Sequence, residues 1–409
     1  MANIKAEALQ MHKANQGKLA THSKVPIRNA RDLSLAYSPG VAEPCKAIYD
    51  NKEAVFDYTM KGNMVGVVTN GSAVLGLGNI GADASIPVME GKSALFKGFA
   101  GVDSFPIALN TENIDEFVQT VKLMEPTFGG INLEDIAAPN CFIIEERLKK
   151  ETNIPIFHDD QHGTAIVTAA GLINALKLSG KSFSDIKVVA NGAGAAGIAI
   201  IKLLYNFGVR DMIMCDSRGA IYDGRTEGMN DVKDEVAKFT NKDKQAGSLE
   251  EVMEGADVFI GVSVGGLLSQ EMVESMNDNP IIFAMANPDP EILPKDAKEA
   301  GAKVIGTGRS DFPNQVNNVL AFPGIFRGAL DVRATRINER MKVAAAEAIA
   351  DLVGDKLSPD YVIPEPFDSR VAPAVAGAVA RAAMESGVAR VDVDPDDVVR
   401  KTEELTSIN

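Results

Sequence analysis

The chain has 409 residues, of which 45% are hydrophobic and 24% charged, the balance of a globular protein of roughly two to three domains. Its net charge of −15 and sequence pI near 4.9 argue against a nucleic-acid-binding surface, which would need a basic stripe. Three cysteines without Cys-x-x-Cys spacing indicate neither a disulfide framework nor a zinc site. Since no stretch of about eighteen apolar residues occurs, we expect no membrane span and a cytoplasmic protein.

The predicted elements change in character near residue 160. Before it, an amphipathic N-terminal helix is followed by short strands, at Met64–Val68, Ala73–Leu77 and Ile154–Phe157, between glycine-rich turns. After it, a helix over about 164–178 is followed by alternating strands and helices, with strands predicted at 185–190, 211–215, 257–260, 281–284 and 302–305. Two alanine-rich helices, at about 335–353 and 370–385, complete the chain.

This order predicts an α/β protein with a doubly wound, Rossmann-type parallel-sheet domain over residues 161–316. An N-terminal α/β domain over residues 1–160 would bind substrate and metal. A C-terminal helical segment over residues 317–409 would pack back on the domains, because alanine-rich helices need tertiary burial to persist.

Two pairs of adjacent acids carry the first chemical signal. Asp159 and Asp160 directly follow the apolar run Ile154–His158, and Glu134 and Asp135 lie a short distance upstream. No Lys or Arg adjoins either pair, so the carboxylates would repel one another unless a divalent cation held them together. Three or four oxygen ligands suit Mg²⁺ or Mn²⁺ better than zinc. The alternative interpretation is a solvated acidic rim.

The turn after Ala190 carries the second signal, in the run Gly192, Ala193, Gly194, Ala195, Ala196, Gly197. This Gly-x-Gly-x-x-Gly pattern follows a predicted strand and opens a predicted helix, and Asp216 ends the next strand 24 residues after Gly192. In that context the glycines let backbone amides at a helix N-terminus meet a pyrophosphate. The alternative is a tight turn without a ligand.

The sequence gives opposing indications of whether NADP or NAD is the preferred nicotinamide cofactor. Asp216 can accept hydrogen bonds from a ribose 2′-hydroxyl, which favours NAD. Arg218, followed by Arg225, can instead pair with the 2′-phosphate of NADP. An exposed turn residue is the alternative interpretation of Arg218.

Two further residues are candidates for proton transfer. Lys92 lies among apolar residues, where desolvation or a metal ion would lower its pKa toward that of a base, although a surface lysine is the simpler interpretation. Tyr37 carries a phenol that can donate a proton, or its ring can simply anchor a turn.

Eight segments together carry a resemblance that covers almost the whole chain: Tyr37–Pro44, Leu75–Gly81, Glu90–Lys92, Leu133–Asp135, Phe157–Thr164, Gly192–Gly197, Ala286–Pro288 and Asn317–Gly324. In these segments the chain resembles malic enzymes of the short bacterial type. The resemblance implies a general base at Lys92, a general acid at Tyr37 and an assisting carboxylate at Asp159. It also implies metal ligands at Glu134, Asp135 and Asp160, and contacts to substrate and the nicotinamide end of the cofactor by Asn287, Asn317 and Asn318.

The activity that the resemblance implies is oxidative decarboxylation of (S)-malate to pyruvate and CO₂ with reduction of NAD(P), and decarboxylation of oxaloacetate. NADP is favoured because short bacterial relatives often prefer it. The resemblance also implies that the chain after about Asn317 returns to the first domain, and that the protein is a homodimer or a larger homo-oligomer. The resemblance fails at Ala73. The long animal-type enzymes are similar here but have an arginine that holds the substrate carboxylate, and Ala73 cannot form that ion pair.

Three other functions are alternatives to this one. A metal-dependent oxaloacetate decarboxylase would use Lys92, Tyr37 and the acids without any nicotinamide. An amino-acid dehydrogenase would pair similar domains but would not need the clustered acids. A nucleotide-sensing module without enzymatic activity would keep only the Gly192–Gly197 turn.

Overall fold

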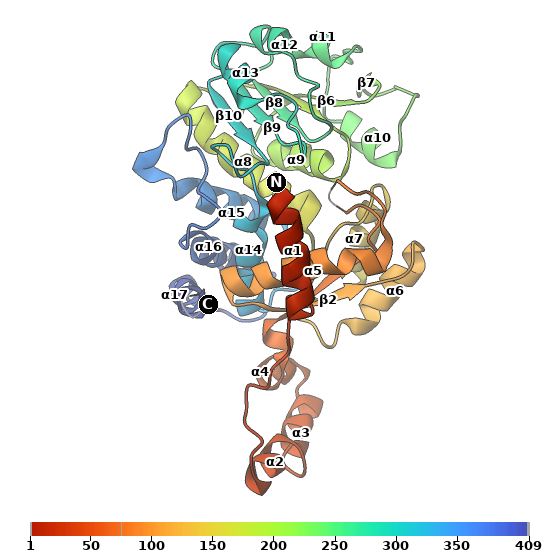
Figure 1. Cartoon of the computed structure of the whole chain (residues 1–409), viewed down its shortest axis with the longest axis vertical. Coiled ribbons are helices and arrows are strands. Elements are labelled where there is room, and N and C mark those ends of the chain that lie inside the picture. Colours follow the sequence, from red (N-terminus) through yellow and green to blue (C-terminus); the bar gives the residue numbers. More distant parts are fainter. Residues whose placement is uncertain (1, 75, 407–409) are drawn as a thin grey trace.

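The computed structural model describes residues 2–74 and 76–406, which build two parallel sheets flanked by helices (Figure 1). The first sheet has the order β2-β1-β3-β4, and its strands are β1 (Met64–Thr69), β2 (Asp103–Ala108), β3 (Gly130–Leu133) and β4 (Ile156–His158). All of its strands pair in parallel. β1, which is valine-rich, and β3 are both fully buried, as central strands of parallel sheets are.

Three helices connect these strands, and they are α5 (Gly81–Ala100), α6 (Ile114–Met124) and α7 (Asn140–Glu151). α6 begins where Asn113 accepts hydrogen bonds from the backbone N–H groups of Asp115 and Glu116, a standard N-terminal cap. α5 ends at Gly101, whose φ of 62° is left-handed. The apolar faces of α6 and α7 cover one face of the sheet.

The second sheet has the order β10-β9-β8-β5-β6-β7 and forms the upper part of Figure 1. Its strands are β5 (Lys187–Asn191), β6 (Asp211–Asp216), β7 (Gly219–Ala220), β8 (Val258–Gly261), β9 (Ile281–Ala284) and β10 (Val304–Thr307). All pair in parallel except β7. Its helices are α9 (Ala195–Asn206), α10 (Asp231–Ala237), α11 (Leu249–Met253), α12 (Gln270–Glu274) and α13 (Pro294–Glu299).

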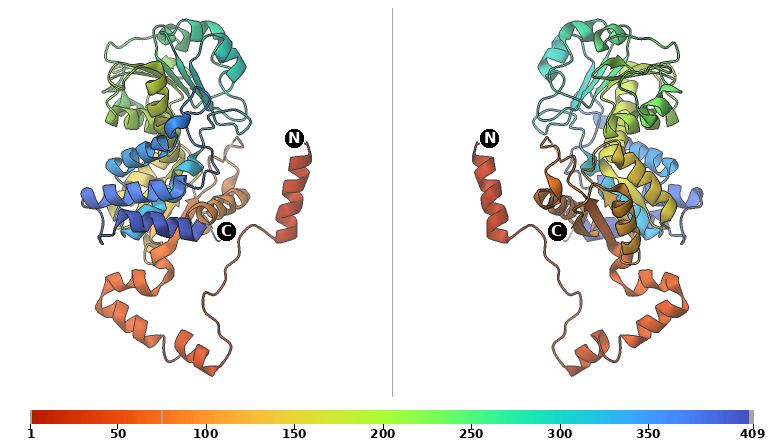
Figure 2. Two further views of the ribbon diagram at one scale, coloured as in Figure 1. Left: turned by 90° about the vertical axis from the view of Figure 1, so that its left-hand side faces the viewer. Right: turned by 90° about the vertical axis from the view of Figure 1, so that its right-hand side faces the viewer.

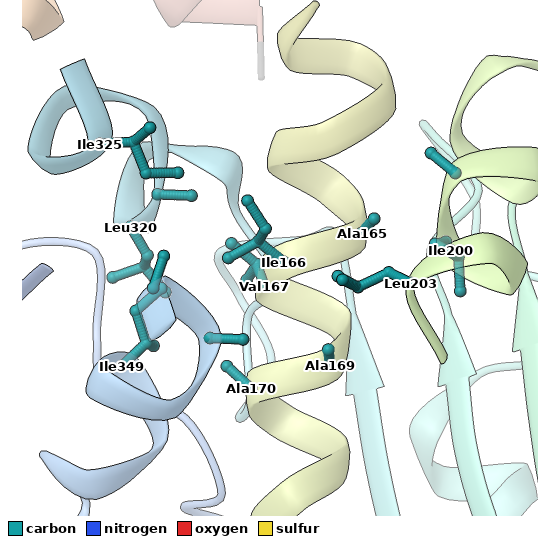
Figure 3. Close-up of a cluster of buried hydrophobic side chains, with 14 of the residues drawn as sticks. Ala165, Ile166, Val167, Ala169, Ala170, Ile200, Leu203, Leu320, Ile325 and Ile349 are labelled. Carbon is teal, nitrogen blue, oxygen red and sulfur yellow. The ribbon is translucent and has the colours of Figure 1, made fainter. Parts of the chain in front are cut away.

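Helix α8 (Asp159–Ser179) joins the two sheets and is buried along most of its length. Figure 3 shows its small side chains meeting different partners on its two sides: Ala165 and Ala169 face Ile200 and Leu203 of α9, whereas Ile166 lies toward Leu320. Alanine on one side lets the α9 backbone approach closely. The helix therefore fixes its first turn relative to both halves of the protein.

The C-terminal helices are α14 (Phe322–Asp331), α15 (Glu339–Asp351), α16 (Val371–Glu385) and α17 (Pro395–Thr406). α14 packs on α5 through edge-on aromatic contacts, in which Phe96 lies 4.8 Å from Phe322 and 5.4 Å from Phe326 between ring centroids. The segment after residue 317 thus contacts α5, a helix of the first sheet.

The N-terminal helices are α1 (Ala2–Asn15), α2 (Ala30–Ala36), α3 (Ala42–Asp50) and α4 (Val55–Tyr58). Residues 19–58, which we call the arm, extend away from the rest of the chain (Figures 1 and 2). α2, α3 and α4 bury no residue, and large apolar side chains of the arm are exposed. The arm therefore lacks a core of its own.

The predicted α/β class and the five predicted strands of the second sheet are confirmed, with strand ends within two residues of the prediction, whereas the short strand β7 was not predicted. Two predictions were wrong. The predicted strand Ala73–Leu77 is a turn in which Val74 bridges Gly78, with residue 75 outside the described part, because its glycines adopt left-handed φ values that strands do not use. The helix predicted from Thr164 starts at Asp159, so the acids lie within its first turn. Among the described residues no helix is long and apolar enough to cross a membrane.

Candidate active site

The two acidic pairs meet at one edge of the first sheet. Glu134 and Asp135 follow β3, Asp159 and Asp160 follow β4, and the two strands pair in parallel with Leu133 opposite His158. Parallel pairing brings the carboxyl ends of neighbouring strands to the same edge. As a result, carboxylate oxygens of Glu134, Asp135 and Asp160 lie within 4.8 Å of one another.

This cluster fits a hard divalent cation. Asp135 Oδ2 is buried and accepts no hydrogen bond from the described residues, while the backbone N–H of Asp135 donates to Asp160 Oδ2 at 2.8 Å. Asp135 adopts a φ of 53°, a strained region for a side chain with a Cβ. Buried oxygens without a donor are costly unless a cation is bound. Glu134, Asp135 and Asp160 would therefore hold Mg²⁺ or Mn²⁺.

Burial and mutual repulsion raise the pKa of each of these carboxyls. Burial raises the pKa of Asp135 to about 8, with the Asp160 charge adding to the effect. Burial likewise raises the pKa of Asp160 to about 6, against the opposing charge of Lys92. Near neutral pH the metal-free cluster thus retains protons that a cation must displace.

We predict from these shifts that Mn²⁺ affinity rises with pH. Because the folded-state pKa values of Asp135 and Asp160 are raised, metal-free stability should decrease and metal affinity increase as pH rises from about 6 to about 8. Electron paramagnetic resonance of free Mn²⁺ across this range measures the affinity. An affinity that does not change with pH would contradict the assignment.

Lys92 of α5 lies between the acidic pairs. Its Nζ is 2.7 Å from Asp159 Oδ2 and 3.0 Å from Glu134 Oε1, and its side chain is 8% exposed. The impression from the sequence that no basic residue adjoins the acids is therefore wrong, because Lys92 is contributed by a helix 67 residues away.

The expected lowering of the Lys92 pKa is also not found in the metal-free protein. Burial alone would lower the pKa of Lys92, but the charges of Asp159 and Glu134 raise it above its ordinary value. The ring of Phe322 adds a favourable contact, with its centroid 4.2 Å from Nζ. Lys92 can become neutral only when another cation takes over the charge of these carboxylates.

Two amides complete the polar surroundings of the carboxylates. Asn318 donates from Nδ2 to Asp159 Oδ2, and Asn132 donates from Nδ2 to Glu134 Oε2 at 2.8 Å. Gly163 is required next to Asp159, since a Cβ there would lie 2.0 Å from Asp159 Oδ1. Asn132 was not among the predicted site residues, although its position two residues before Glu134, on the same side of an extended strand, was a usable signal.

The remaining predicted site residues occupy different places. Asn287 follows β9 at the edge of the second sheet, where a Cβ on Gly308 would lie 3.0 Å from its Nδ2. Asn317 caps a short 3-10 turn by accepting from the N–H of Val319. Tyr37 directly follows α2 as its C-terminal cap and is 68% exposed. α2 lies at the far end of the arm, away from α5, the helix that carries Lys92 (Figure 1).

The predicted glycine-rich turn forms a nucleotide cradle between β5 and α9, which begins at Ala195. A Cβ on Gly197 would lie 1.8 Å from the carbonyl oxygen of Gly192, so only glycine allows this close approach. A cavity of about 730 Å³ opens beside the turn and is lined by Gly192, Ala193, Asp216, Arg218 and neighbours. Its size fits a dinucleotide portion of a cofactor.

Asp216 is the last residue of β6, lines this cavity and pairs with two basic side chains. Its Oδ2 is 2.5 Å from Arg225 Nη2 and 2.7 Å from Lys233 Nζ, and its Oδ1 accepts from the N–H of Arg218 at 2.9 Å. The side chain of Arg218 is half exposed and pairs with Glu227 at 2.7 Å. Although burial opposes it, these partners lower the pKa of Asp216. Lys233 was not among the predicted residues, because it lies 17 positions away on a helix of its own.

The second sheet, with its glycine-rich turn and adjoining cavity, defines a Rossmann-type dinucleotide-binding protein, in which three buried or half-buried carboxylates cluster at the edge of the first sheet. The profile described as malic enzyme, N-terminal domain matches residues 16–149, and that described as malic enzyme, NAD binding domain matches residues 161–384. The chain belongs to the malic enzyme family.

Individual proteins of this family are similar over nearly the whole chain. The bifunctional malic/malolactic enzyme of Bacillus subtilis is 75% identical over 407 residues, which cover 99% of each protein. The NADP-dependent malic enzyme of Rhizobium meliloti is 55% identical over 95% of this chain, but the chain spans only 53% of that longer protein. The crystal structure of malic enzyme from Pyrococcus horikoshii has a TM-score of 0.96 at 46% identity, covering 99% of this chain and 96% of that one.

Proposed function

We propose that the chain oxidatively decarboxylates (S)-malate to pyruvate and CO₂ while reducing NAD(P), and also decarboxylates oxaloacetate. The observation that carries the proposal is the position of Lys92, which is buried between Asp159 and Glu134 beside the carboxylate cluster. This arrangement supplies a base next to a charge-stabilising site, which alcohol oxidation needs.

The proton balance of the reaction assigns roles to the chain's residues. Lys92, once neutral, takes the C2 hydroxyl proton as hydride leaves C2 for the nicotinamide. Asp159, 2.7 Å from Lys92, holds the resulting ammonium and can pass its proton on. After CO₂ leaves, an acid must protonate C3 of the enol, and Tyr37 is proposed for this step. Glu134, Asp135 and Asp160 would hold a cation that, when bound, would supply Lewis-acid stabilisation of negative charge on the C2 oxygen.

Absorbance of reduced nicotinamide tests this function directly. We expect malate and Mn²⁺ to produce it, excess chelator to stop it and added Mn²⁺ to restore it. Oxaloacetate decarboxylation without any malate oxidation would select the redox-free decarboxylase instead. Metal-independent oxidation of an amino acid would select an amino-acid dehydrogenase.

A second product, lactate, is favoured by the 75% identity to an enzyme named malic/malolactic. Returning the hydride to C2 of pyruvate before release would yield lactate and CO₂ from malate with no net redox change. Lactate formed from malate with only catalytic amounts of cofactor would support this activity. Release of pyruvate alone, in step with reduced cofactor, would exclude it.

We propose that two copies of the chain form a homodimer in which each arm supplies Tyr37 to the other copy's site. The side chains of Leu35, Tyr37 and Tyr49 on the arm are 67%, 68% and 88% exposed. Because exposure of apolar surface to water is unfavourable, a second copy of the chain that covered this surface would stabilise it. A site with Lys92 and the carboxylates but without its acid is incomplete. Exchange of the arms would complete both sites at once.

Mixed dimers test the exchange. Refolding Lys92→Ala together with Tyr37→Phe should restore on the order of one quarter of wild-type activity, because half of randomly assembled dimers are mixed and one of their two sites is intact. If each Tyr37 instead served its own chain, every site would lack one group. Activity would then stay at the average of the two parent variants.

We also propose a preference for NADP with some NAD activity remaining. Arg225 and Lys233 offset the charge of Asp216, so a 2′-phosphate meets less repulsion there than a free carboxylate would give. Arg218, half exposed at the cavity, can turn from Glu227 toward the phosphate.

Arg218→Ala should reduce kcat/KM for NADP by about 1 to 3 kcal/mol of transition-state stabilisation and leave NAD almost unchanged. Steady-state kinetics with both cofactors measures this. The matched control is Glu227→Gln, which frees Arg218 and should keep or improve NADP use. An equal loss with both cofactors would make Arg218 structural and return the preference to NAD through Asp216.

A further inference from the structure

A network of charged and polar groups contacts the first turn of α8. Glu145 of α7 is 5% exposed, and its two carboxylate oxygens lie 2.8 and 2.9 Å from His162 Nε2. On the other side of the imidazole, Lys342 Nζ is 3.1 Å from His162 Nδ1 and 2.7 Å from Glu339 Oε1. Three helices, α7, α8 and α15, therefore meet at one histidine.

The contacts determine which nitrogen of His162 carries the hydrogen. An ammonium can only donate, so His162 Nδ1 accepts from Lys342 and Nε2 carries the hydrogen that points to Glu145. The imidazole has a donor and an acceptor, each matched to a partner. Its ring orientation is consequently fixed from both sides.

Glu145 forms hydrogen bonds at both ends of the first turn of α8. Besides His162, it accepts from the backbone N–H of His158 at 3.2 Å. Asp159 and Asp160 lie between these two contact points, so the direction of their side chains depends on the turn that Glu145 holds. Apolar packing does not replace this hold, because a cavity of about 570 Å³ opens beside Glu145, His162 and Lys342.

We propose that Glu145 and His162 are positioning residues that set the geometry of the cation site through the first turn of α8. The inference rests on the proposed function, since it concerns the same carboxylates. It adds residues outside that site that determine how tightly the cation binds. Groups that orient metal ligands are worth about 10- to 100-fold in metal affinity.

Glu145→Gln tests the proposal against the neighbouring Glu146→Gln. Glutamine keeps the shape of Glu145 but presents an amide donor to the N–H groups of His158 and His162, which disturbs the turn. Glu146 is 68% exposed and pairs with Lys150, so its variant removes the same charge without touching α8. The measurement is Mn²⁺ binding by electron paramagnetic resonance, together with kcat and KM for malate and for the cofactor.

We expect Glu145→Gln to weaken Mn²⁺ binding about 10-fold and to lower kcat/KM for malate in parallel, with the cofactor KM unchanged. Wild-type Mn²⁺ affinity in Glu145→Gln, or an equal loss in Glu146→Gln, would overturn the proposal. If the wild type itself bound no Mn²⁺, the proposed function would fall with it.

Lys342→Met provides a second, milder variant in case Glu145→Gln does not fold. It keeps the contact between Glu145 and His162 but removes the group that fixes Nδ1, so we expect Mn²⁺ to bind about 3-fold more weakly. The double variant should lose less than the sum of the two single effects, because both act through His162. Unchanged Mn²⁺ affinity in Lys342→Met, or strictly additive effects of the two substitutions, would show that Glu145, His162 and Lys342 only stabilise the fold.

Discussion

Glu134→Gln, Asp135→Asn and Asp160→Asn are each expected to lower kcat/KM for malate by at least about 100-fold. Even groups that merely orient metal ligands cost 10- to 100-fold, and these three would be the ligands themselves. Their oxygens lie within 4.8 Å of one another, and each variant removes one charge from a small set. Steady-state kinetics at saturating Mn²⁺, with Mn²⁺ binding measured separately, tests the prediction.

Folding should survive these changes. Burial and the charge of Asp160 raise the pKa of Asp135, so the ionised carboxyl destabilises the metal-free protein above its ordinary pKa. At about pH 8 the metal-free Asp135→Asn variant should therefore melt at or above the wild-type Tm. Asp83→Asn, an exposed acid in the first turn of α5, is the matched control and should retain full activity. Full metal-dependent activity in all three ligand variants would refute the site.

The second large effect is expected for Lys92. Lys92→Ala should lower kcat for malate oxidation by about 100- to 10,000-fold, the usual contribution of general acid–base catalysis. Binding of NADPH, followed by its fluorescence, should remain close to wild type because Lys92 acts on the substrate. The variant isolates the chemical step from assembly of the cofactor site.

Lys92→Arg distinguishes a base from a fixed charge. Arginine keeps the positive charge between Asp159 and Glu134 but remains protonated in proteins, so it cannot accept the hydroxyl proton. We expect Lys92→Arg to fold with nearly wild-type Tm and to be as inactive as Lys92→Ala. Substantial activity in Lys92→Arg would reduce Lys92 to an electrostatic partner of the carboxylates.

Local pattern predicted the elements of the second sheet well. Runs such as Ile281–Ala284 are apolar, β-rich and bounded by turn residues, and β9 has these bounds. The loop around Val74 was harder, because its apolar letters resemble a strand while its glycines require left-handed backbone. The first sheet was less visible, since β2 is only partly buried and its helices separate strands that pair across long stretches of chain.

Local sequence features are enough to predict the candidate chemistry of the chain. Acids directly after β3 and β4, and glycines between β5 and α9, are local features, and parallel strands bring their carboxyl ends to one edge whatever the details of packing. The balance of charge among these groups depends on the tertiary structure. It placed Lys92 of α5 between the acidic pairs and Asn318 on Asp159 across 159 residues, and so raised the pKa of Lys92 where burial alone predicts the opposite. It also left Tyr37 exposed on the arm and joined Glu145 to His158 and His162, on either side of Asp159 and Asp160. Contacts between residues so far apart depend on how helices pack, and periodicity and motif spacing do not encode that packing.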